Sequence, residues 1–222
     1  MLDIPLNSLH RPAAVSDDQA WLLVLMHGVG SNEQDLFGLA PYVPEHFHVL
    51  SLRAPYRMGP NANAWFEFSV NGDGSRTINA PQESASRALL LQTIETAARQ
   101  LRVPASRVIV GGFSQGGIMG LSVLLTRPQM VAGGMALHSR LLPEVVNQIA
   151  PASEFEGKAL WVSQGLQDNV IPPDNGRFIC EQVQNLPLKL TYREFEGAHE
   201  LRPAELQAVV AWLAQLNSVS AS

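Results

Sequence analysis

The short motif GFSQG at residues 112–116 is the part of this chain that most directly suggests chemistry. It follows an apolar run at residues 107–113 and opens a helical stretch at residues 114–125. When a strand turns this sharply into a helix, the serine backbone is strained, and flanking glycines remove side chains that would collide. The serine hydroxyl then projects alone beside a helix N-terminus, which stabilises negative charge. The motif therefore predicts that Ser114 is a nucleophile.

A serine hydroxyl needs a base before it can attack a carbonyl carbon. After such a motif the acid and then the base follow in the chain, each on a loop behind a later strand. His199 follows the apolar run at residues 188–195 and is the only histidine there, so we expect it to be the base. Asp168 follows the run at residues 158–163, where its carboxylate can accept the imidazole N–H and fix the tautomer. Other carboxylates in these loops remain alternatives for the acid: Asp174, Glu196 and Glu200.

The segment MHGVG at residues 26–30 ends the first long apolar run. Its glycines let the backbone run close to a substrate, so that an N–H of this segment can point into the site. Together with the N–H of Gln115 it would provide two donors for a tetrahedral oxyanion. We expect His27 to organise this loop rather than to transfer protons.

The elements that position these residues alternate between short apolar runs and longer helical stretches. Apolar runs that predict strands occupy residues 21–26, 47–52, 107–113, 131–137, 158–163 and 188–195. Helical patterns occupy residues 33–42, 81–101, 114–125, 174–186 and 203–216. This alternation predicts an α/β fold with a mostly parallel sheet and helices on both faces. Residues 53–79 fit neither pattern and predict an unusually long loop.

Composition narrows the class of protein. Hydrophobic residues make up 46% of the 222 residues and charged residues 16%, below the roughly 25% of average soluble chains, so we expect a sizeable core. A net charge of −5 without a basic run argues against nucleic-acid binding. The longest apolar stretch is far below the roughly 20 residues of a membrane helix, and the first residues do not resemble a signal peptide. We therefore expect one cytoplasmic domain over residues 1–222, with a frayed tail at 218–222 and no integral membrane association.

Metal and redox sites find little support in the sequence. The single cysteine, Cys180, excludes an internal disulfide and a cysteine-cluster metal site, and it reads as a small buried hydrophobe. His46 and His48 would share one face of a strand, but they have no acidic or cysteine companion. No phosphate loop or dinucleotide fingerprint occurs. We expect neither a metal nor an organic cofactor.

Five blocks in order, HGVGSNEQDL, RAPYRMGPNANAWFEF, GGFSQGG, GLQDNVIPP and EGAHEL, span residues 27–201. Together they resemble the phospholipase/carboxylesterase family of small serine hydrolases, which includes the acyl-protein thioesterases. The resemblance implies an α/β-hydrolase fold without a separate lid domain, and hydrolysis of an ester or thioester through an acyl-enzyme. It makes a homodimer plausible.

The resemblance also implies roles for individual residues. Ser114 would be the nucleophile, Asp168 the acid and His199 the base, with oxyanion N–H groups at Val29 and Gln115. The segment of Trp65 and Phe66 resembles an aromatic wall beside the site, although core packing explains Trp65 equally well.

The chain departs from the family pattern in two places. Residues 137–140 read LHSR where the family commonly has a Leu-Ser-Gly type sequence, which places His138 and Arg140 close to the expected pocket. Arg140 would favour an anionic acyl or head group, unless it simply points to solvent. The second departure, Ala198 before the base, is mild. Both leave the reaction class unchanged and affect only substrate choice.

The leading hypothesis is a serine carboxylesterase acting on a small-molecule ester. A thioesterase or lysophospholipase for longer acyl chains is the alternative within the same class. A non-catalytic binding module on a hydrolase scaffold and acyl transfer to an alcohol are two further hypotheses.

Overall fold

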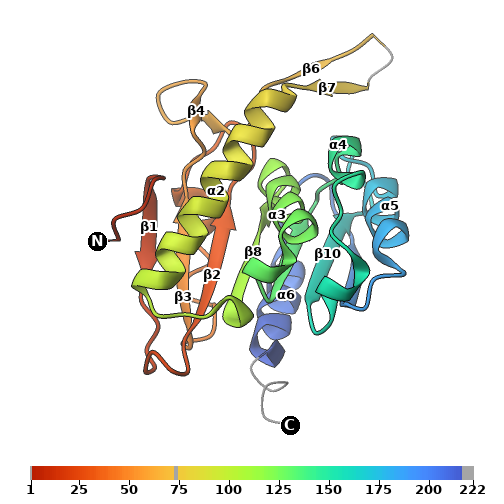
Figure 1. The fold of residues 1–222 in the computed structure, drawn as a ribbon. Coiled ribbons are helices and arrows are strands. Elements are labelled where there is room, and N and C mark those ends of the chain that lie inside the picture. Colours follow the sequence, from red (N-terminus) through yellow and green to blue (C-terminus); the bar gives the residue numbers. More distant parts are fainter. Residues whose placement is uncertain (1, 73–74, 217–222) are drawn as a thin grey trace.

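The computed structural model describes residues 2–72 and 75–216, so the predicted tail at residues 218–222 lies outside the described part. Its centre is a seven-stranded sheet in the order β1-β3-β2-β8-β9-β10-β11 (Figure 1). The strands are β1 (Ser8–Arg11), β2 (Trp21–Met26), β3 (Phe47–Leu52), β8 (Val108–Phe113), β9 (Gly133–Leu137), β10 (Ala159–Gly165) and β11 (Lys189–Phe195). All neighbours pair in parallel except β1 and β3. The predicted α/β-hydrolase fold with a mostly parallel sheet is thus confirmed.

Helices cover both faces of this sheet (Figure 1). The α-helices are α1 (Gln34–Phe37), α2 (Ala80–Gln100), α3 (Gln115–Thr126), α4 (Pro143–Val146), α5 (Asp174–Val183) and α6 (Pro203–Leu216). Short 3-10 turns lie at η1 (Ala105–Arg107), η2 (Pro128–Met130) and η3 (Ala152–Phe155). No separate lid domain is evident in the part of the chain that the structure describes. None of the described helices has the length and apolar character needed to span a membrane.

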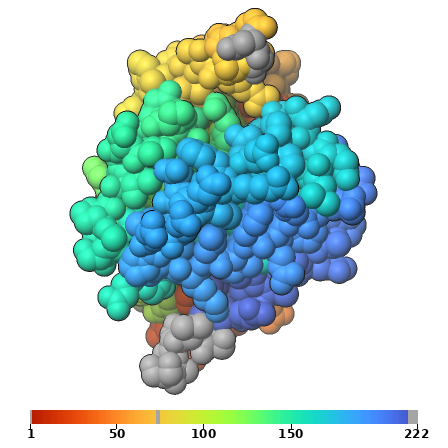
Figure 2. Space-filling view, turned by 90° about the vertical axis from the view of Figure 1, so that its right-hand side faces the viewer, coloured from red at the N-terminus to blue at the C-terminus, as the bar shows by residue number. Residues whose placement is uncertain are grey.

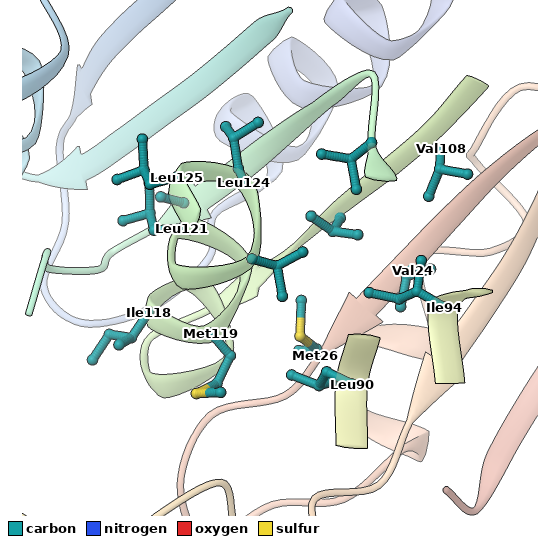
Figure 3. Close-up of a cluster of buried hydrophobic side chains, with 14 of the residues drawn as sticks. Val24, Met26, Leu90, Ile94, Val108, Ile118, Met119, Leu121, Leu124 and Leu125 are labelled. Atoms are coloured by element: carbon teal, nitrogen blue, oxygen red, sulfur yellow. The ribbon is translucent and has the colours of Figure 1, made fainter. Parts of the chain in front are cut away.

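Strand periodicity explains why the core has two layers. All six residues of β2 are buried, and successive side chains point to opposite faces. Val24 and Met26 join a cluster that includes side chains of α2, α3 and α5, whereas Leu23 joins a cluster with side chains of α1 and α6. Figure 3 shows Met26 beside Met119 of α3 and Leu90 of α2. A strand covered on both faces must read as a continuous apolar run, as this one does.

Three elements differ from the sequence prediction. The expected long loop at residues 53–79 contains two hairpins, β4 (Tyr56–Arg57) with β5 (Asn63–Ala64) and β6 (Phe68–Val70) with β7 (Arg76–Ile78). The edge strand β1 was not predicted, because half-buried edge positions need no apolar run. The helix expected at residues 33–42 forms only at Gln34–Phe37, since Gly38 and Pro41 oppose its extension.

The parallel strands place the loops that carry chemistry at one edge. Strands β2, β8, β9, β10 and β11 all end on the same side of the sheet, and β8 has β2 and β9 as direct neighbours. The segments that follow these strands therefore meet, although up to about 170 residues separate them in the chain. This edge is where open α/β sheets bind their ligands.

Candidate active site

Ser114 stands at the turn from β8 into α3 with φ 54° and ψ −118°, a conformation that non-glycine residues rarely adopt. One hydrogen bond and two close-packed glycines maintain this conformation. Its N–H donates to the carbonyl of Leu137 at 2.8 Å. A Cβ on either Gly112 or Gly116 would lie 1.9 Å from the carbonyl oxygen of Met26, so only glycine fits on both sides of the serine.

His199 connects the serine to a buried carboxylate. Its Nε2 lies 2.9 Å from Ser114 Oγ, and its Nδ1 lies 2.7 Å from Asp168 Oδ2. The other carboxylate oxygen, Asp168 Oδ1, accepts the backbone N–H groups of Val170 and Ile171 at 2.9 and 2.8 Å. The Asp168 side chain is 0% exposed and that of His199 is 16% exposed, so of these two only His199 faces outward.

The other carboxylates considered for the acid are engaged elsewhere. Asp174 bonds Arg177, Glu196 bonds Gln167, and Glu200 bonds Arg202. Of the four predicted alternatives, Asp168 is the one that the structure brings to the imidazole of His199.

The charge on Asp168 favours one tautomer of His199 in the row formed by Ser114, His199 and Asp168. Burial by itself raises the pKa of Asp168, but the hydrogen bonds donated by His199 and by the N–H of Ile171 outweigh it and leave the pKa of Asp168 below its ordinary value. An ionised Asp168 accepts the Nδ1–H of His199. The lone pair on His199 Nε2 then faces the hydroxyl of Ser114, as proton removal from the serine requires.

Two backbone N–H groups are available near Ser114. Gln115 is the first residue of α3, so its N–H has no partner within the helix. Neither this N–H nor that of Val29 donates a hydrogen bond to another described residue. The loop of Val29 is close to the serine, because a Cβ on Gly28 would lie 3.4 Å from Ser114 Cβ. Such donors suit an oxyanion formed at the serine.

His27 organises the loop that carries Val29. Its Nε2 accepts the N–H of Ala54 at 3.0 Å, so its Nδ1 carries the proton and donates to the carbonyl of Gly28 at 2.7 Å. Burial lowers the pKa of His27, which keeps the ring neutral. The indole N–H of Trp65 donates to the carbonyl of His27 at 3.0 Å. These bonds support the predicted organising role.

Trp65 and Phe66 are core residues rather than an exposed wall. Their side chains are 0% and 1% exposed, so neither presents a surface to a substrate. Of the two interpretations left open by the sequence, the structure favours core packing. The side chain of Gln115 clamps this segment, accepting the N–H of Trp65 at 2.8 Å and donating to the carbonyl of Phe66 at 2.7 Å. No pattern in the sequence predicts this clamp.

Comparison with known proteins decides the family. Residues 13–217 match the family model described as Phospholipase/Carboxylesterase. The chain belongs to the phospholipase/carboxylesterase family. This member of the family is a serine hydrolase.

Curated relatives and solved structures agree with this assignment. An acyl-protein thioesterase 1 of Gibberella zeae is 25% identical, with 75% of this chain and 73% of that protein covered. An acyl-protein thioesterase 1 of Schizosaccharomyces pombe is 27% identical over 84% of this chain and 87% of that protein. The structure of a Bacillus cereus carboxylesterase superimposes with a TM-score of 0.81 at 17% identity, covering 96% of each chain. A Zea mays acyl-protein thioesterase 2 gives 0.77 at 18% identity, over 96% of this chain and all of the other. Because the two solved structures are only 17% and 18% identical to this chain, their similarity shows the fold alone.

A buried histidine extends the row behind Asp168 in this family member. His138 Nδ1 lies 3.1 Å from Asp168 Oδ2, and His138 Nε2 lies 3.0 Å from Glu205 Oε2. Ser163 Oγ donates to Glu205 Oε1 at 2.6 Å. The sequence marked His138 only as a departure from the family pattern. It gave no sign of Glu205, because a glutamate in the first turn of a helix is common on protein surfaces.

Three of these groups also resemble a metal-ligand set. The donor atoms of His138, Asp168 and His199 lie within 4.8 Å of one another. However, the Nδ1 of His199 is only 2.7 Å from Asp168 Oδ2, whereas two ligands of one tetrahedral zinc ion lie about 3.3 Å apart. The spacing is that of hydrogen bonds, so these residues do not fit a zinc site.

Arg140, which belongs to the first departure from the family pattern, lines a cavity of about 630 Å³. Arg76 of β7 lines the same cavity, together with residues 169–172 of the loop that follows Asp168. In Figure 2 the yellow-orange segment that contains the β6–β7 hairpin lies above the cyan and light-blue segments that contain this loop. Arg140 forms no hydrogen bond or ion pair with another residue in the described ranges. Burial and the charge of Arg76 lower the pKa of Arg140 below its usual value.

Proposed function

We propose that this hydrolase is a serine carboxylesterase that cleaves carboxylic esters through an acyl-enzyme. The observation that carries the proposal is the row of three side chains, with 2.9 Å between Ser114 Oγ and His199 Nε2 and 2.7 Å between His199 Nδ1 and Asp168 Oδ2. Two unengaged backbone N–H groups beside the serine, at Val29 and Gln115, supply the oxyanion donors.

Acylation begins when the ester carbonyl lies against these donors. Ser114 Oγ attacks the carbonyl carbon while its proton passes to His199 Nε2, and the carbonyl oxygen becomes an oxyanion held by the two N–H groups. Asp168 stabilises the imidazolium by accepting its Nδ1–H. The bond to the leaving oxygen then breaks, and that oxygen takes the proton from His199. The products of this half-reaction are a free alcohol and an acyl group on Ser114.

Deacylation repeats the same steps with water. Water attacks the acyl carbon and gives its proton to His199 Nε2. The bond between the carbon and Ser114 Oγ breaks, and the oxygen of Ser114 recovers the proton from His199. The carboxylic acid leaves and the site returns to its starting state.

Replacement of the nucleophile tests the proposal. Ser114→Ala is expected to lower kcat for p-nitrophenyl acetate by about 10⁴-fold or more and to abolish labelling by a fluorophosphonate probe. Ser84→Ala, an exposed serine on α2, is the matched control and is expected to match the wild type in both assays. Undiminished hydrolysis by Ser114→Ala, with an unchanged circular dichroism spectrum, would refute the proposal.

The names of the relatives favour a second candidate, a thioesterase or lysophospholipase for longer acyl chains. Two of the curated relatives are named acyl-protein thioesterase 1, and a thioester would use the same residues with sulfur as the leaving atom. Matched oxyester and thioester substrates with acyl chains of two to about sixteen carbons separate the candidates. A kcat/KM that rises with chain length for thioesters supports the second candidate, whereas a maximum at short oxyesters supports the first.

For the substrate contact, we infer that Arg140 binds an anionic group of the substrate. Two arginines line one cavity beside the Asp168 loop, and a substrate carboxylate or phosphate there would relieve the repulsion between Arg140 and Arg76. The same inference covers both the acyl side and the alcohol side of the ester, because the cavity alone does not distinguish them.

Monoesters that carry a free carboxylate, compared with their neutral amide analogues, test this contact. Arg140→Gln is expected to lower kcat/KM about 10-fold or more for the carboxylate substrate and to leave the neutral substrate within about twofold. Arg57→Gln, an exposed arginine on β4, is the control. Equal losses on both substrates would contradict a role in recognising charge.

A further inference from the structure

A buried chain of polar side chains continues from the reactive serine into the protein. It runs from His199 through Asp168 to His138, and from there to Glu205 and Ser163. The side chains of His138 and Glu205 are each 1% exposed and that of Asp168 is 0% exposed. Ionisable groups this deeply buried are costly unless they are paired, so the pairing determines which of them are charged.

The geometry favours a positively charged His138. Both of its ring nitrogens face carboxylate oxygens, at 3.1 Å for Asp168 and 3.0 Å for Glu205. When both carboxylates are ionised, a neutral imidazole, with one N–H and one lone pair, would turn its lone pair toward an oxygen lone pair at one nitrogen. An imidazolium donates through both nitrogens and satisfies both carboxylates. Burial on its own lowers the pKa of His138, but the hydrogen bonds and charges of Glu205 and Asp168 outweigh it and raise that pKa.

Three titratable side chains from different parts of the fold face His138. Glu205 comes from α6, Asp168 from the loop after β10, and His199 from the loop after β11. The rings of His138 and His199 meet edge to face with their centres 5.8 Å apart, and Phe113 of β8 contacts both rings. Within the described residues, no other titratable group is in hydrogen-bond contact with His138.

The backbone at this position supports a specific placement of the histidine. His138 has φ 48°, in the left-handed region where few residues other than glycine, asparagine, aspartate and histidine occur. Its N–H donates to the carbonyl of Ser163 at 2.8 Å. A Cβ on Gly165 would lie 2.9 Å from His138 Cε1, so a glycine keeps the space that the ring occupies.

We propose that His138 and Glu205 form a positioning pair that extends the working range of this esterase toward acidic pH. The imidazolium of His138 cancels part of the negative charge that Asp168 presents to His199. Ser114-dependent hydrolysis is therefore expected to persist to a lower pH than it would beside an uncompensated carboxylate. Glu205 orients the His138 ring by accepting from Nε2, and Asp168 accepts from Nδ1, so that His138 stays charged when Glu205 alone is neutralised. This inference rests on the proposed esterase function, since neither residue touches the substrate.

The two members of the pair carry opposite charges, so neutralising one or the other should shift the acid limb of the kcat/KM profile in opposite directions. His138→Asn removes the positive charge and keeps a residue that tolerates the left-handed backbone. For a unit charge about 5.8 Å from the base and an effective dielectric constant of about 20–40, the acid limb of kcat/KM should move up by about 1–2 pH units. Glu205→Gln removes a more distant negative charge, and Gln can still accept from His138 Nε2. Its acid limb should move down by about 0.5–1 pH unit.

Controls separate this electrostatic effect from loss of packing. Glu95→Gln makes the same change of charge at an exposed position of α2 and is expected to leave the pH profile unchanged. A merely structural pair would lower kcat or stability in both variants and would shift the acid limb in neither. Shifts in the same direction, or shifts below about 0.2 pH units, overturn the proposal.

A second measurement does not depend on activity, and it keeps the proposal testable if His138→Asn fails to fold. In Ser114→Ala protein labelled with ¹⁵N-histidine, His138 at neutral pH should show both ring nitrogens protonated. The Glu205→Gln variant identifies the resonance by its change. A single protonated nitrogen on His138 overturns the proposal whatever the kinetics show. Conversely, a charged His138 in a protein without Ser114-dependent hydrolysis would leave its charge assignment intact and refute the esterase function instead.

Discussion

The clamp formed by the Gln115 side chain leads to a prediction in which one substitution affects both the free energy of unfolding and the position of the loop that carries Val29. Gln115→Glu keeps the shape of the side chain and the backbone N–H, and one oxygen can still accept from the N–H of Trp65. The other oxygen of the carboxylate would face the carbonyl of Phe66, which now accepts from Gln115 Nε2 at 2.7 Å. The substitution therefore replaces a buried hydrogen bond with a buried repulsion.

The expected cost follows from that loss. A buried acceptor left without its donor costs about 1–3 kcal/mol, and a charged group at the same place costs more. We expect the free energy of unfolding to fall by about 2–4 kcal/mol, which lowers Tm by about 4–16 °C for a chain of this size. The indole of Trp65 holds the carbonyl of His27 and so the position of Val29. A displacement there of about 1 Å should lower kcat about 10- to 100-fold.

Gln82→Glu is the matched control. Gln82 also accepts a backbone N–H, that of Glu67 at 2.7 Å, but its side chain is at the surface, where a carboxylate accepts equally well. Urea unfolding followed by tryptophan fluorescence and esterase kinetics are measured for both variants. The control should stay within about 0.5 kcal/mol of the wild type.

The pH dependence of the Gln115→Glu defect gives a further check. Burial and the facing carbonyl raise the pKa of the introduced carboxyl, so it becomes protonated as the pH falls and can again donate to Phe66. Relative to Gln82→Glu, the destabilisation should therefore shrink in mild acid. Equal stability and equal kcat for the two variants near pH 7 would refute the reasoning.

Two further predictions concern the turn at Ser114 and the edge strand β1. Gly116→Ala would place a methyl group 1.9 Å from the carbonyl oxygen of Met26, so we expect the free energy of unfolding in urea to fall by more than about 3 kcal/mol. Gly38→Ala meets only an ordinary 3.5 Å contact and should be nearly neutral. Similar values for both variants would contradict the steric argument. Burial and the nearby His48 lower the pKa of His10 to about 4. As the pH falls, the His10 ring is therefore protonated in the unfolded chain before it is protonated in the folded protein. The free energy of unfolding should fall as the pH drops from about 6.5 to about 4. His10→Leu should reduce the difference in unfolding free energy between about pH 7 and about pH 5, and an unchanged difference would exclude His10 as its source.

Local physics explains why so much of the site could be predicted from the sequence. The apolar run before residue 112 and the glycines on both sides of Ser114 specify a tight turn from a strand to a helix without reference to the rest of the chain. The order of serine, acid and base along the chain follows from the parallel sheet, which brings the ends of successive strands to one edge. The sequence favoured Asp168 as the acid, and the structure shows that Asp174, Glu196 and Glu200 bond other residues instead of His199.

The residues that the sequence missed owe their roles to distant partners. Glu205 appears in the sequence as an ordinary first-turn glutamate, and only the packing of α6 against the sheet buries it on His138. Gln115 and Trp65 are fifty residues apart, and no periodicity marks their bond. The hairpin that carries Arg76 to the cavity of Arg140 lies in a stretch without a regular pattern.

The sequence by itself therefore determined the layers of the sheet and the strained turn at Ser114, because short-range sterics and strand periodicity encode them, and it singled out His199 as the expected base. The tertiary structure alone decided which carboxylate meets the base, which histidine stands behind it and which backbone N–H groups remain unengaged. Those outcomes depend on side chains that converge from separate loops. Their burial and charge exist only once the chain has folded.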